Sequence, residues 1–186
     1  MLIKESKLKG VFEIDLEPHE DRRGFFVRVY DNAIFKQYGI HRDWVQENQS
    51  LSKEKGTIRG LHFQFPPHTE TKLVRVVSGE VYDVIVDLRK GSATFGEWDS
   101  FRISADNKKM IYIPRGFAHG MCTLTKNCAM LYKVDNYYAP ESEGTIIWDD
   151  PDIGIDWPVE NPILSEKDSR AQSFKEFVET HVGLEV

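Results

Sequence analysis

Short runs in which apolar and polar residues alternate follow one another along most of the chain. In the run 81–88, every second residue from Tyr82 to Leu88 is apolar, whereas Asp83 and Asp87 lie on the opposite face. Alternation with a period of two predicts a β-strand that buries one face. The two carboxylates predict that the second face meets water or a polar lumen.

Similar runs recur between turn residues, and little helix separates them. We expect further strands at 11–16, 24–30, 44–46, 57–65, 72–77, 98–103, 109–113, 120–124 and 129–134. Strands at intervals of about 8–12 residues are typical of all-β sandwiches and barrels. Because the edge strands of such a fold invite pairing, we also expect a homodimer.

Two segments have the spacing of helices instead. The run 32–38, which a glycine follows, predicts one short helix with a C-terminal stop. Near the end of the chain, apolar residues recur at helical spacing between Phe174 and His181. They predict an amphipathic helix over about 165–182, packed on the β-body. With 186 residues and no linker or repeat, the chain is expected to form a single domain, 1–186.

The net charge limits the classes of partner that the chain can bind. A formal net charge of −6 argues against general nucleic-acid binding, but a few Arg and Lys side chains can still hold an anionic small molecule. No apolar run suits a signal peptide or a transmembrane helix, so we expect no membrane association. Cys122 and Cys128 lack a metal-ligand pattern and are expected to be free thiols of a cytoplasmic protein.

The stretch 56–77 mixes charged and hydrogen-bonding side chains into residues that otherwise predict buried strand: Arg59, His62, Gln64 and Lys72. Burying such groups without partners is costly, so they predict a polar cavity inside the β-structure. Strict alternation puts His62 on one face of its strand and Arg59 on the other. If both reach one site, Gly60 marks a bulge or kink; otherwise Arg59 reaches around a strand edge or to a partner subunit.

Several longer segments, spread along the chain, can be compared with known sequence families. They are DRRGFF (21–26), GTIRGLHFQ (56–64), KLVRVVSGEVYDVIVDLR (72–89), YIPRGFAHG (112–120), YYAPESEG (137–144), WDDPDIGIDWP (148–158) and LSEKD (164–168). Together they resemble the dTDP-4-dehydrorhamnose 3,5-epimerase family over nearly the whole chain. The resemblance implies a homodimeric, cupin-type jelly roll with no metal or organic cofactor. It also implies an isomerase that epimerises a nucleotide-linked 4-keto-6-deoxy hexose at C3 and C5.

The resemblance assigns the chemistry to a small set of side chains. His62 matches the family's base, and Asp168 matches the acid that orients this histidine. Lys72 matches the cation near the C4 oxygen, where it would stabilise an enolate, and Tyr132 matches the general acid on the opposite face. Each also has a plainer interpretation: a core histidine, a helix-capping acid after Ser165, a solvated strand-end lysine and a buried aromatic.

Further positions match residues with which the family holds the nucleotide and the sugar. They are Arg23, Gln46, Asn48, Arg59, Lys72, His119, Tyr138, Glu143 and Lys167. Guanidinium groups suit a diphosphate, and Tyr138 would stack on the thymine ring. Arg28 departs from the pattern, because many members carry a ligand-contacting Glu there, so the nucleobase and the sugar stay open.

Three alternatives stay open as well. A C3-only epimerase of a related sugar nucleotide would use the same residues. A metal-dependent cupin would use His62, His68, Glu70 and His119, although the usual pair of histidines one residue apart is absent. A non-catalytic sugar-nucleotide binding module would need no base and acid, so the presence of both argues against it.

Overall fold

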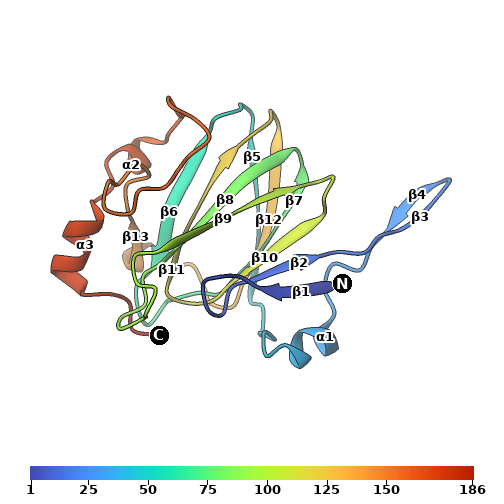
Figure 1. Cartoon of the computed structure of the whole chain (residues 1–186), viewed down its shortest axis with the longest axis horizontal. Helices are drawn as coiled ribbons and strands as arrows, with labels where there is room; N and C mark the ends of the chain where they lie inside the picture. The colour runs from blue at the N-terminus through green and yellow to red at the C-terminus, as the bar shows by residue number, and fades with distance from the viewer.

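Two antiparallel β-sheets lie face to face in the computed structural model, which describes residues 1–186 (Figure 1). The first sheet has six strands in the order β1 (Leu2–Glu5), β2 (Phe12–Asp15), β10 (Lys109–Ile113), β7 (Lys72–Ser78), β12 (Cys128–Val134) and β5 (Gln46–Ser52). The second has five, in the order β13 (Glu143–Thr145), β6 (Ile58–Gln64), β11 (Phe117–Thr123), β8 (Glu80–Asp87) and β9 (Trp98–Ser104). The chain changes sheet at nearly every connection from β6 to β12, which is the winding of a jelly roll. The predicted all-β fold is therefore confirmed.

The elements outside the two sheets are short. β3 (His19–Asp21) and β4 (Gly24–Phe26) form a hairpin that projects away from the body in Figure 1. The helix predicted near the N-terminus is α1 (Asn32–Gln37), which Asp31 caps by accepting hydrogen bonds from two backbone N–H groups. A 3₁₀ turn, Pro140–Ser142, leads into β13. None of the helices has the length and hydrophobicity needed to cross a membrane.

The prediction of one helix over 165–182 is wrong. The segment folds into two helices, α2 (Glu166–Ser169) and α3 (Phe174–His181), and each begins at its own serine cap. Between them, the carbonyl of Gln172 accepts a hydrogen bond from the N–H of Ile147 at 2.9 Å. This contact with the segment after β13 interrupts the helix, and residue spacing alone does not reveal it.

Most predicted strands are confirmed within a few residues of their ends, and the exceptions lie where polar residues dominate. The strand expected at 44–46 begins only at Gln46 and continues to Ser52 as β5, through the polar run QENQSLS. The strand expected at 24–30 ends at Phe26, and β1, β3 and β13 were not expected. A polar strand such as β5 escapes hydrophobic patterning because its partly buried face lines a polar cavity instead of an apolar core.

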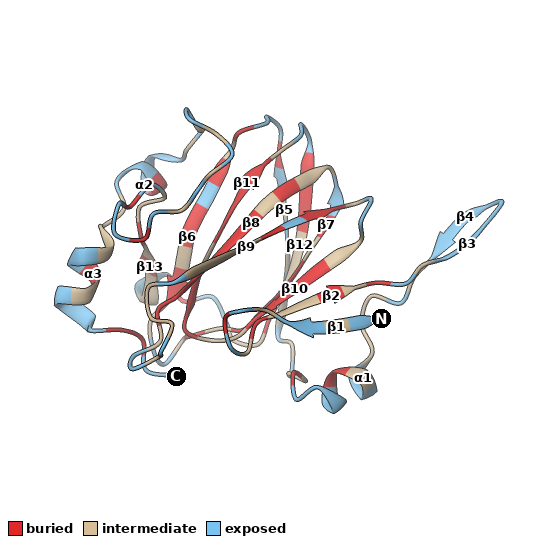
Figure 2. Cartoon of the chain, viewed as in Figure 1, coloured by how far each residue is buried: buried red, intermediate tan, exposed pale blue.

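The main core lies between the sheets. It contains apolar side chains of both, among them Val74, Val76, Val81, Ile85, Ile103, Ile111 and Met121. A second cluster lies on the other face of the five-stranded sheet, where Val84, Val86 and Leu88 belong with Phe177 of α3. Figure 2 shows the buried residues concentrated in the two sheets, whereas the β3–β4 hairpin is exposed. The helix α3 therefore covers the outside of the sheet that carries β6.

The alternation predicted for β8 is confirmed, but both of its faces are buried. The face with Asp83 and Asp87 does not meet water, because neither side chain is exposed. Asp83 lies on the side that faces the other sheet, where its carboxylate contacts His119 and does not line the polar cavity. Asp87 accepts hydrogen bonds from the guanidinium of Arg89 and from the hydroxyl groups of Ser92 and Thr94.

Candidate active site

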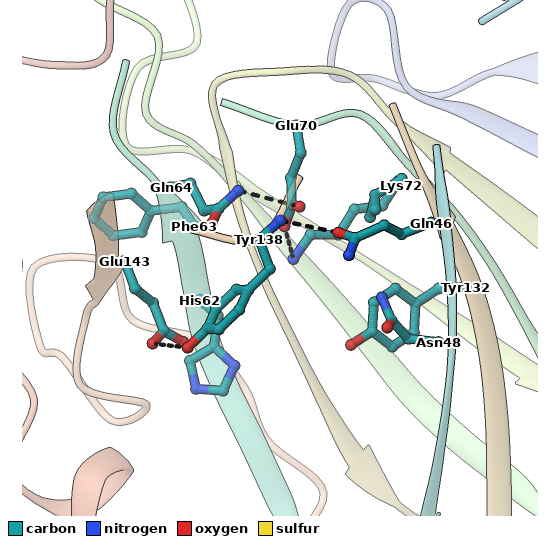
Figure 3. Close-up of a pocket in the computed structure, with 11 residues that line it drawn as sticks. Gln46, Asn48, His62, Phe63, Gln64, Glu70, Lys72, Tyr132, Tyr138 and Glu143 are labelled. Carbon is teal, nitrogen blue, oxygen red and sulfur yellow. Dashed lines mark hydrogen bonds and ion pairs between the residues drawn. The ribbon is translucent and has the colours of Figure 1, made fainter. Parts of the chain in front are cut away.

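A cavity of about 360 Å³ lies between the two sheets. The residues that line it are Gln46, Asn48, His62, Phe63, Gln64, Glu70, Lys72, Tyr132, Val134, Tyr138 and Glu143. They come from β5, β7 and β12 of one sheet, from β6 and β13 of the other, and from the loops that follow β6 and β12 (Figure 3). This is the polar cavity that the stretch 56–77 predicts.

His62 lies on β6 and reaches the cavity with 32% of its side chain exposed. Its Nε2 lies 2.6 Å from Oδ1 of Asp168, which is buried on α2. Burial alone would raise the pKa of Asp168, but the hydrogen bond and charge of His62, together with Ser165, lower that pKa below its ordinary value. Because an ionised carboxylate only accepts hydrogen bonds, Nε2 carries the proton, and in the neutral imidazole Nδ1 has the lone pair that a base needs.

The two interpretations of Asp168 are compatible. Its backbone N–H donates to Oγ of Ser165 at 3.1 Å, which caps α2, while its carboxylate contacts His62. The Ser165 cap fixes the first turn of the helix, and this turn packs against β6. Helix capping therefore places the acid beside the histidine and does not replace that contact.

The kink predicted at Gly60 is present. Its φ is +125°, and a Cβ added there would lie 2.5 Å from Cα of Gly120, so the strands approach too closely for any side chain. The register between β6 and β11 shifts at this point. As a result, Arg59 and His62 both line a second hollow of about 250 Å³, which Lys167 also lines and which shares His62 with the cavity.

Lys72 begins β7 and lies inside the cavity, with 11% of its side chain exposed. Its Nζ lies 3.3 Å from Oε1 of Glu70. The other oxygen of this carboxylate accepts a hydrogen bond from Nε2 of Gln64 at 3.3 Å. The lysine is therefore a partnered cation in the site and not a solvated strand end.

Tyr132 enters the cavity from β12, in the sheet opposite the one that carries His62 (Figure 3). It pairs in register with Asn48 of β5, which is another lining residue. Burial raises the pKa of the phenol, and the negative charge of Glu70 raises it further, while Arg59 acts in the opposite direction. The phenol therefore stays protonated at neutral pH and can donate its proton.

Tyr138 connects several of the predicted ligand-binding residues. Its backbone N–H donates to Oε1 of Gln46 at 2.9 Å, and its hydroxyl donates to Oε2 of Glu143 at 3.1 Å. Glu143 also forms an ion pair with Lys167, with 2.5 Å between the charged atoms. The ring of Tyr138 is largely exposed, so it presents an aromatic surface beside the cavity.

Two predicted ligand-binding residues line neither the cavity nor the hollow beside it. His119 stands opposite His62 on the neighbouring strand β11, and its Nε2 lies 2.8 Å from Oδ2 of Asp83. Arg23 lies at the turn of the β3–β4 hairpin, with 83% of its side chain exposed, and bonds to Asp21. Within a single chain, the structure brings neither of them to the cavity wall.

Phe63, Glu70 and Val134 line the cavity without having been predicted as catalytic or substrate-binding residues, whereas Gln64 was predicted to face a polar cavity without an assigned role. An amide in a buried strand is a signal for Gln64, and Glu70 precedes Lys72 by the spacing that puts two side chains on one side of an extended chain. The metal-dependent alternative loses its ligand set, because no group of three or more His, Cys, Asp or Glu is placed to hold a metal ion.

Comparisons with known proteins agree with one another. The chain matches, over residues 5–176, the sequence model of a family described as dTDP-4-dehydrorhamnose 3,5-epimerase. It is 43% identical over 175 residues to the Shigella flexneri protein of that name, and the matched region covers 94% of this chain and 96% of the relative. A Bacillus anthracis dTDP-4-dehydrorhamnose 3,5-epimerase structure with TDP and PPi bound has a TM-score of 0.91 and 42% identity, covering 93% of this chain and 99% of that one. A Legionella pneumophila dTDP-6-deoxy-D-glucose-3,5-epimerase in complex with dTDP-4-keto-L-rhamnose has a TM-score of 0.92 and 38% identity, covering 100% of this chain and 98% of that one.

Proposed function

Because the chain belongs to the dTDP-4-dehydrorhamnose 3,5-epimerase family, a family of isomerases with a cupin-type fold, we propose that it inverts C3 and C5 of dTDP-4-dehydro-6-deoxy-D-glucose. The product would be dTDP-4-dehydro-L-rhamnose. The observation that carries this proposal is the placement of His62 and Tyr132 on opposite sheets across one cavity. An epimerase removes hydrogen from one face of a carbon and delivers it to the other, which requires a base and an acid so arranged.

The first step is removal of the proton at C3 or C5 by Nδ1 of His62. The electron pair of the broken C–H bond moves toward the C4 ketone and forms an enolate. Asp168 accepts the hydrogen bond from Nε2 and offsets the positive charge that His62 acquires. The ammonium of Lys72, which faces the cavity, stabilises the negative charge on the enolate oxygen.

In the second step, Tyr132 donates its hydroxyl proton to the same carbon from the opposite face. The enolate electron pair forms the new C–H bond, and the ketone is restored. His62 then releases its proton to water, and the phenolate of Tyr132 regains one. Each inversion therefore replaces one carbon-bound hydrogen with a hydrogen from the solvent.

The surroundings of the cavity suit a nucleoside diphosphate. The hollow beside it is lined by Arg59 and Lys167, whose charged groups pair well with phosphate oxygens. Tyr138 is exposed, and its backbone bonds to Gln46, so its ring is available to stack on the base. Asn48 supplies a further hydrogen-bonding group for the sugar.

The protein acts, in this proposal, as a homodimer in which the β3–β4 hairpin of one chain completes the site of the other. The hairpin projects from the body and exposes Phe25 and Phe26, which is unfavourable for an arm without a partner (Figure 1). Arg23 sits on this arm, away from the cavity of its own chain, and Arg28 follows it. A second copy would bring a cation toward the diphosphate.

Mixing two impaired variants tests this arrangement. If Arg23 acts across the interface, a heterodimer of an Arg23→Ala chain and a His62→Ala chain contains one site in which both native residues are present. Activity then returns after subunit exchange. If Arg23 acts within its own chain, no activity returns, and a monomer mass at micromolar concentration contradicts the dimer itself.

Both cysteines are buried and unbridged, as expected. Free thiols are usual where reducing conditions prevail, and they support the proposal that the protein works in the cytoplasm.

NMR of the product formed from dTDP-4-dehydro-6-deoxy-D-glucose in deuterated buffer tests the proposed reaction. A 3,5-epimerase incorporates deuterium at both C3 and C5. Incorporation at C3 alone identifies the C3-only epimerase, which the same residues would serve. No incorporation at either carbon identifies a non-catalytic binding module and contradicts the proposed function.

A further inference from the structure

Glu70 is the carboxylate nearest the cation of the cavity. It lies in the loop between β6 and β7, lines the cavity, and has 13% of its side chain exposed. One of its oxygens lies 3.3 Å from Nζ of Lys72, and the other accepts the hydrogen bond from Gln64 (Figure 3). Glu70 is the one ion-pair partner that Lys72 has in the structure. A buried ammonium that lacks a counter-ion is strongly destabilised, so this contact matters for keeping the cation in the site.

We propose that Glu70 is a positioning residue for the reaction: its carboxylate fixes Lys72 against the ketone oxygen of the sugar and links this ammonium, through Gln64, to the segment that carries Tyr138. The inference rests on the proposed function, because it requires a ketone in the cavity. Glu70 acts through Lys72 and Gln64 and forms no bond with the reacting carbons.

Gln64 makes this link rigid. Its side-chain NH₂, which has two hydrogens to share, lies within hydrogen-bond distance of three acceptors: the carbonyl of His68 at 2.8 Å, that of Tyr137 at 3.2 Å, and the carboxylate of Glu70 at 3.3 Å. Its Oε1 accepts the backbone N–H of Ala139 at 2.7 Å. The backbone groups on both sides of Tyr138 are therefore tied to one buried amide. A change at Glu70 is transmitted to the cation directly and to the aromatic wall through this amide.

The charge of Glu70 also acts on the acid of the second step. Glu70 and Glu143 both raise the pKa of the Tyr132 phenol, in addition to burial, whereas Arg59 lowers it. Lys72 and His62 line the same cavity as the phenol. Replacing Glu70 with a neutral side chain removes one of the two negative charges that keep Tyr132 protonated. An acid must be protonated to act, so activity would then be lost at a lower pH.

The variant Glu70→Gln tests the inference, because the amide keeps the shape but loses the charge and has one acceptor oxygen where the carboxylate has two. We expect kcat for epimerisation to fall roughly tenfold, as for the loss of one hydrogen bond to a charged group. KM should change less than kcat, because Tyr138 keeps its backbone hydrogen bond to Gln46 and the cations of the adjoining hollow are unaffected. The alkaline limb of the kcat profile should move to lower pH. Glu70→Asp, which keeps the charge, should restore the position of that limb.

Glu141→Gln is the matched control. Glu141 is exposed, lies on the segment after Tyr138, and lines no part of the cavity, so its removal changes the net charge equally. It should leave the kcat profile unchanged. If Glu70→Gln shows the wild-type kcat and the wild-type alkaline limb, the inference is wrong. If Glu70→Gln does not fold, Glu70→Asp decides: an alkaline limb at the wild-type position supports the role of the charge, and a limb displaced to lower pH although the charge is kept contradicts it.

These outcomes differ from a failure of the proposed function. If the wild-type protein incorporates no deuterium at C3 or C5, the proposed function fails. If the wild type exchanges both hydrogens and Glu70→Gln exchanges them identically at every pH, only the assignment of Glu70 fails.

Discussion

The site contains two histidine–aspartate pairs that stand side by side on neighbouring strands. His62 on β6 and His119 on β11 are register partners. Each bonds through Nε2 to a buried carboxylate: His62 to Asp168 at 2.6 Å, and His119 to Asp83 at 2.8 Å. In the pattern of residue types, the two pairs are alike.

Their surroundings differ. The side chain of His62 is 32% exposed and lines the cavity, whereas that of His119 is 11% exposed and does not. Asp168 lies on a helix outside the sheets and also contacts Ser165, whereas Asp83 is buried in β8 with Oδ1 unpartnered. A histidine–aspartate pair becomes a base only where the second ring nitrogen meets a substrate. Under the proposed mechanism, the difference favours the first pair as the base and leaves the second as a buried contact within the sheet.

The largest effect should come from removing the imidazole of His62, which lines the cavity. We expect His62→Ala to slow deuterium incorporation at both C3 and C5 by about 10²–10⁴-fold, because no other side chain replaces the base. Affinity for dTDP, measured by calorimetry, should be nearly unchanged, since the proposed nucleotide contacts lie in the adjoining hollow. Exchange at the wild-type rate in this variant would show that the base is another residue.

Tyr132 faces the first pair across the cavity, so its removal should separate the two half-reactions. We expect Tyr132→Phe to reduce inversion by about 10²-fold and to reduce hydrogen exchange less, because His62 can still abstract a proton and return one to the same face. Product NMR distinguishes the two, since exchange without inversion gives deuterated substrate. Equal loss of exchange and inversion would contradict the assignment of Tyr132 as the acid.

The contrast between the two pairs also explains what the sequence could predict. His62, Lys72 and Tyr132 lie in apolar strand patterns, where a polar side chain marks a site, and all of them line the cavity. The contact between His62 and Asp168 joins residues 106 positions apart. It depends on the short helix α2, which the spacing of apolar residues merged with α3 into one longer helix. The sequence patterns cannot show which of two histidines on adjacent strands reaches open space.

The same limit applies to β5 and Glu70. β5 was largely missed because its residues are polar, and they are polar because they face the cavity. Glu70 precedes a predicted strand, and its two-residue spacing from Lys72 does not by itself distinguish a buried counter-ion from a loop carboxylate. Hydrophobic alternation predicts the sheets well, because burial between sheets is a local pattern repeated many times. It does not predict a polar interior, which is assembled from single residues of several strands.

Equivalent changes in the two aspartates should affect mainly catalysis in one case and mainly stability in the other. We expect Asp168→Asn to lower kcat roughly tenfold, because the amide still accepts from Nε2 but does not offset the charge on His62. Asp83→Asn should leave kcat within about threefold of the wild type but lower the free energy of unfolding by about 1–3 kcal/mol, because it disturbs a fully buried polar contact. Kinetics and urea unfolding measure the two effects, and a larger loss of kcat in Asp83→Asn would reverse the roles assigned to the pairs.

The smallest effect concerns the pH dependence of stability. The pKa of Asp168 is lowered in the folded protein from its ordinary value of 3.8, since His62 and Ser165 favour the carboxylate over the acid. A group of this kind contributes stability above its unfolded pKa and loses that contribution as the pH falls through the lower, folded pKa. The difference in unfolding free energy between the wild type and Asp168→Asn should therefore shrink as the pH falls below 3.8. Urea unfolding at a series of acidic pH values measures this difference. A difference that stays constant throughout the acid range would mean that His62 and Ser165 do not stabilise the carboxylate of Asp168.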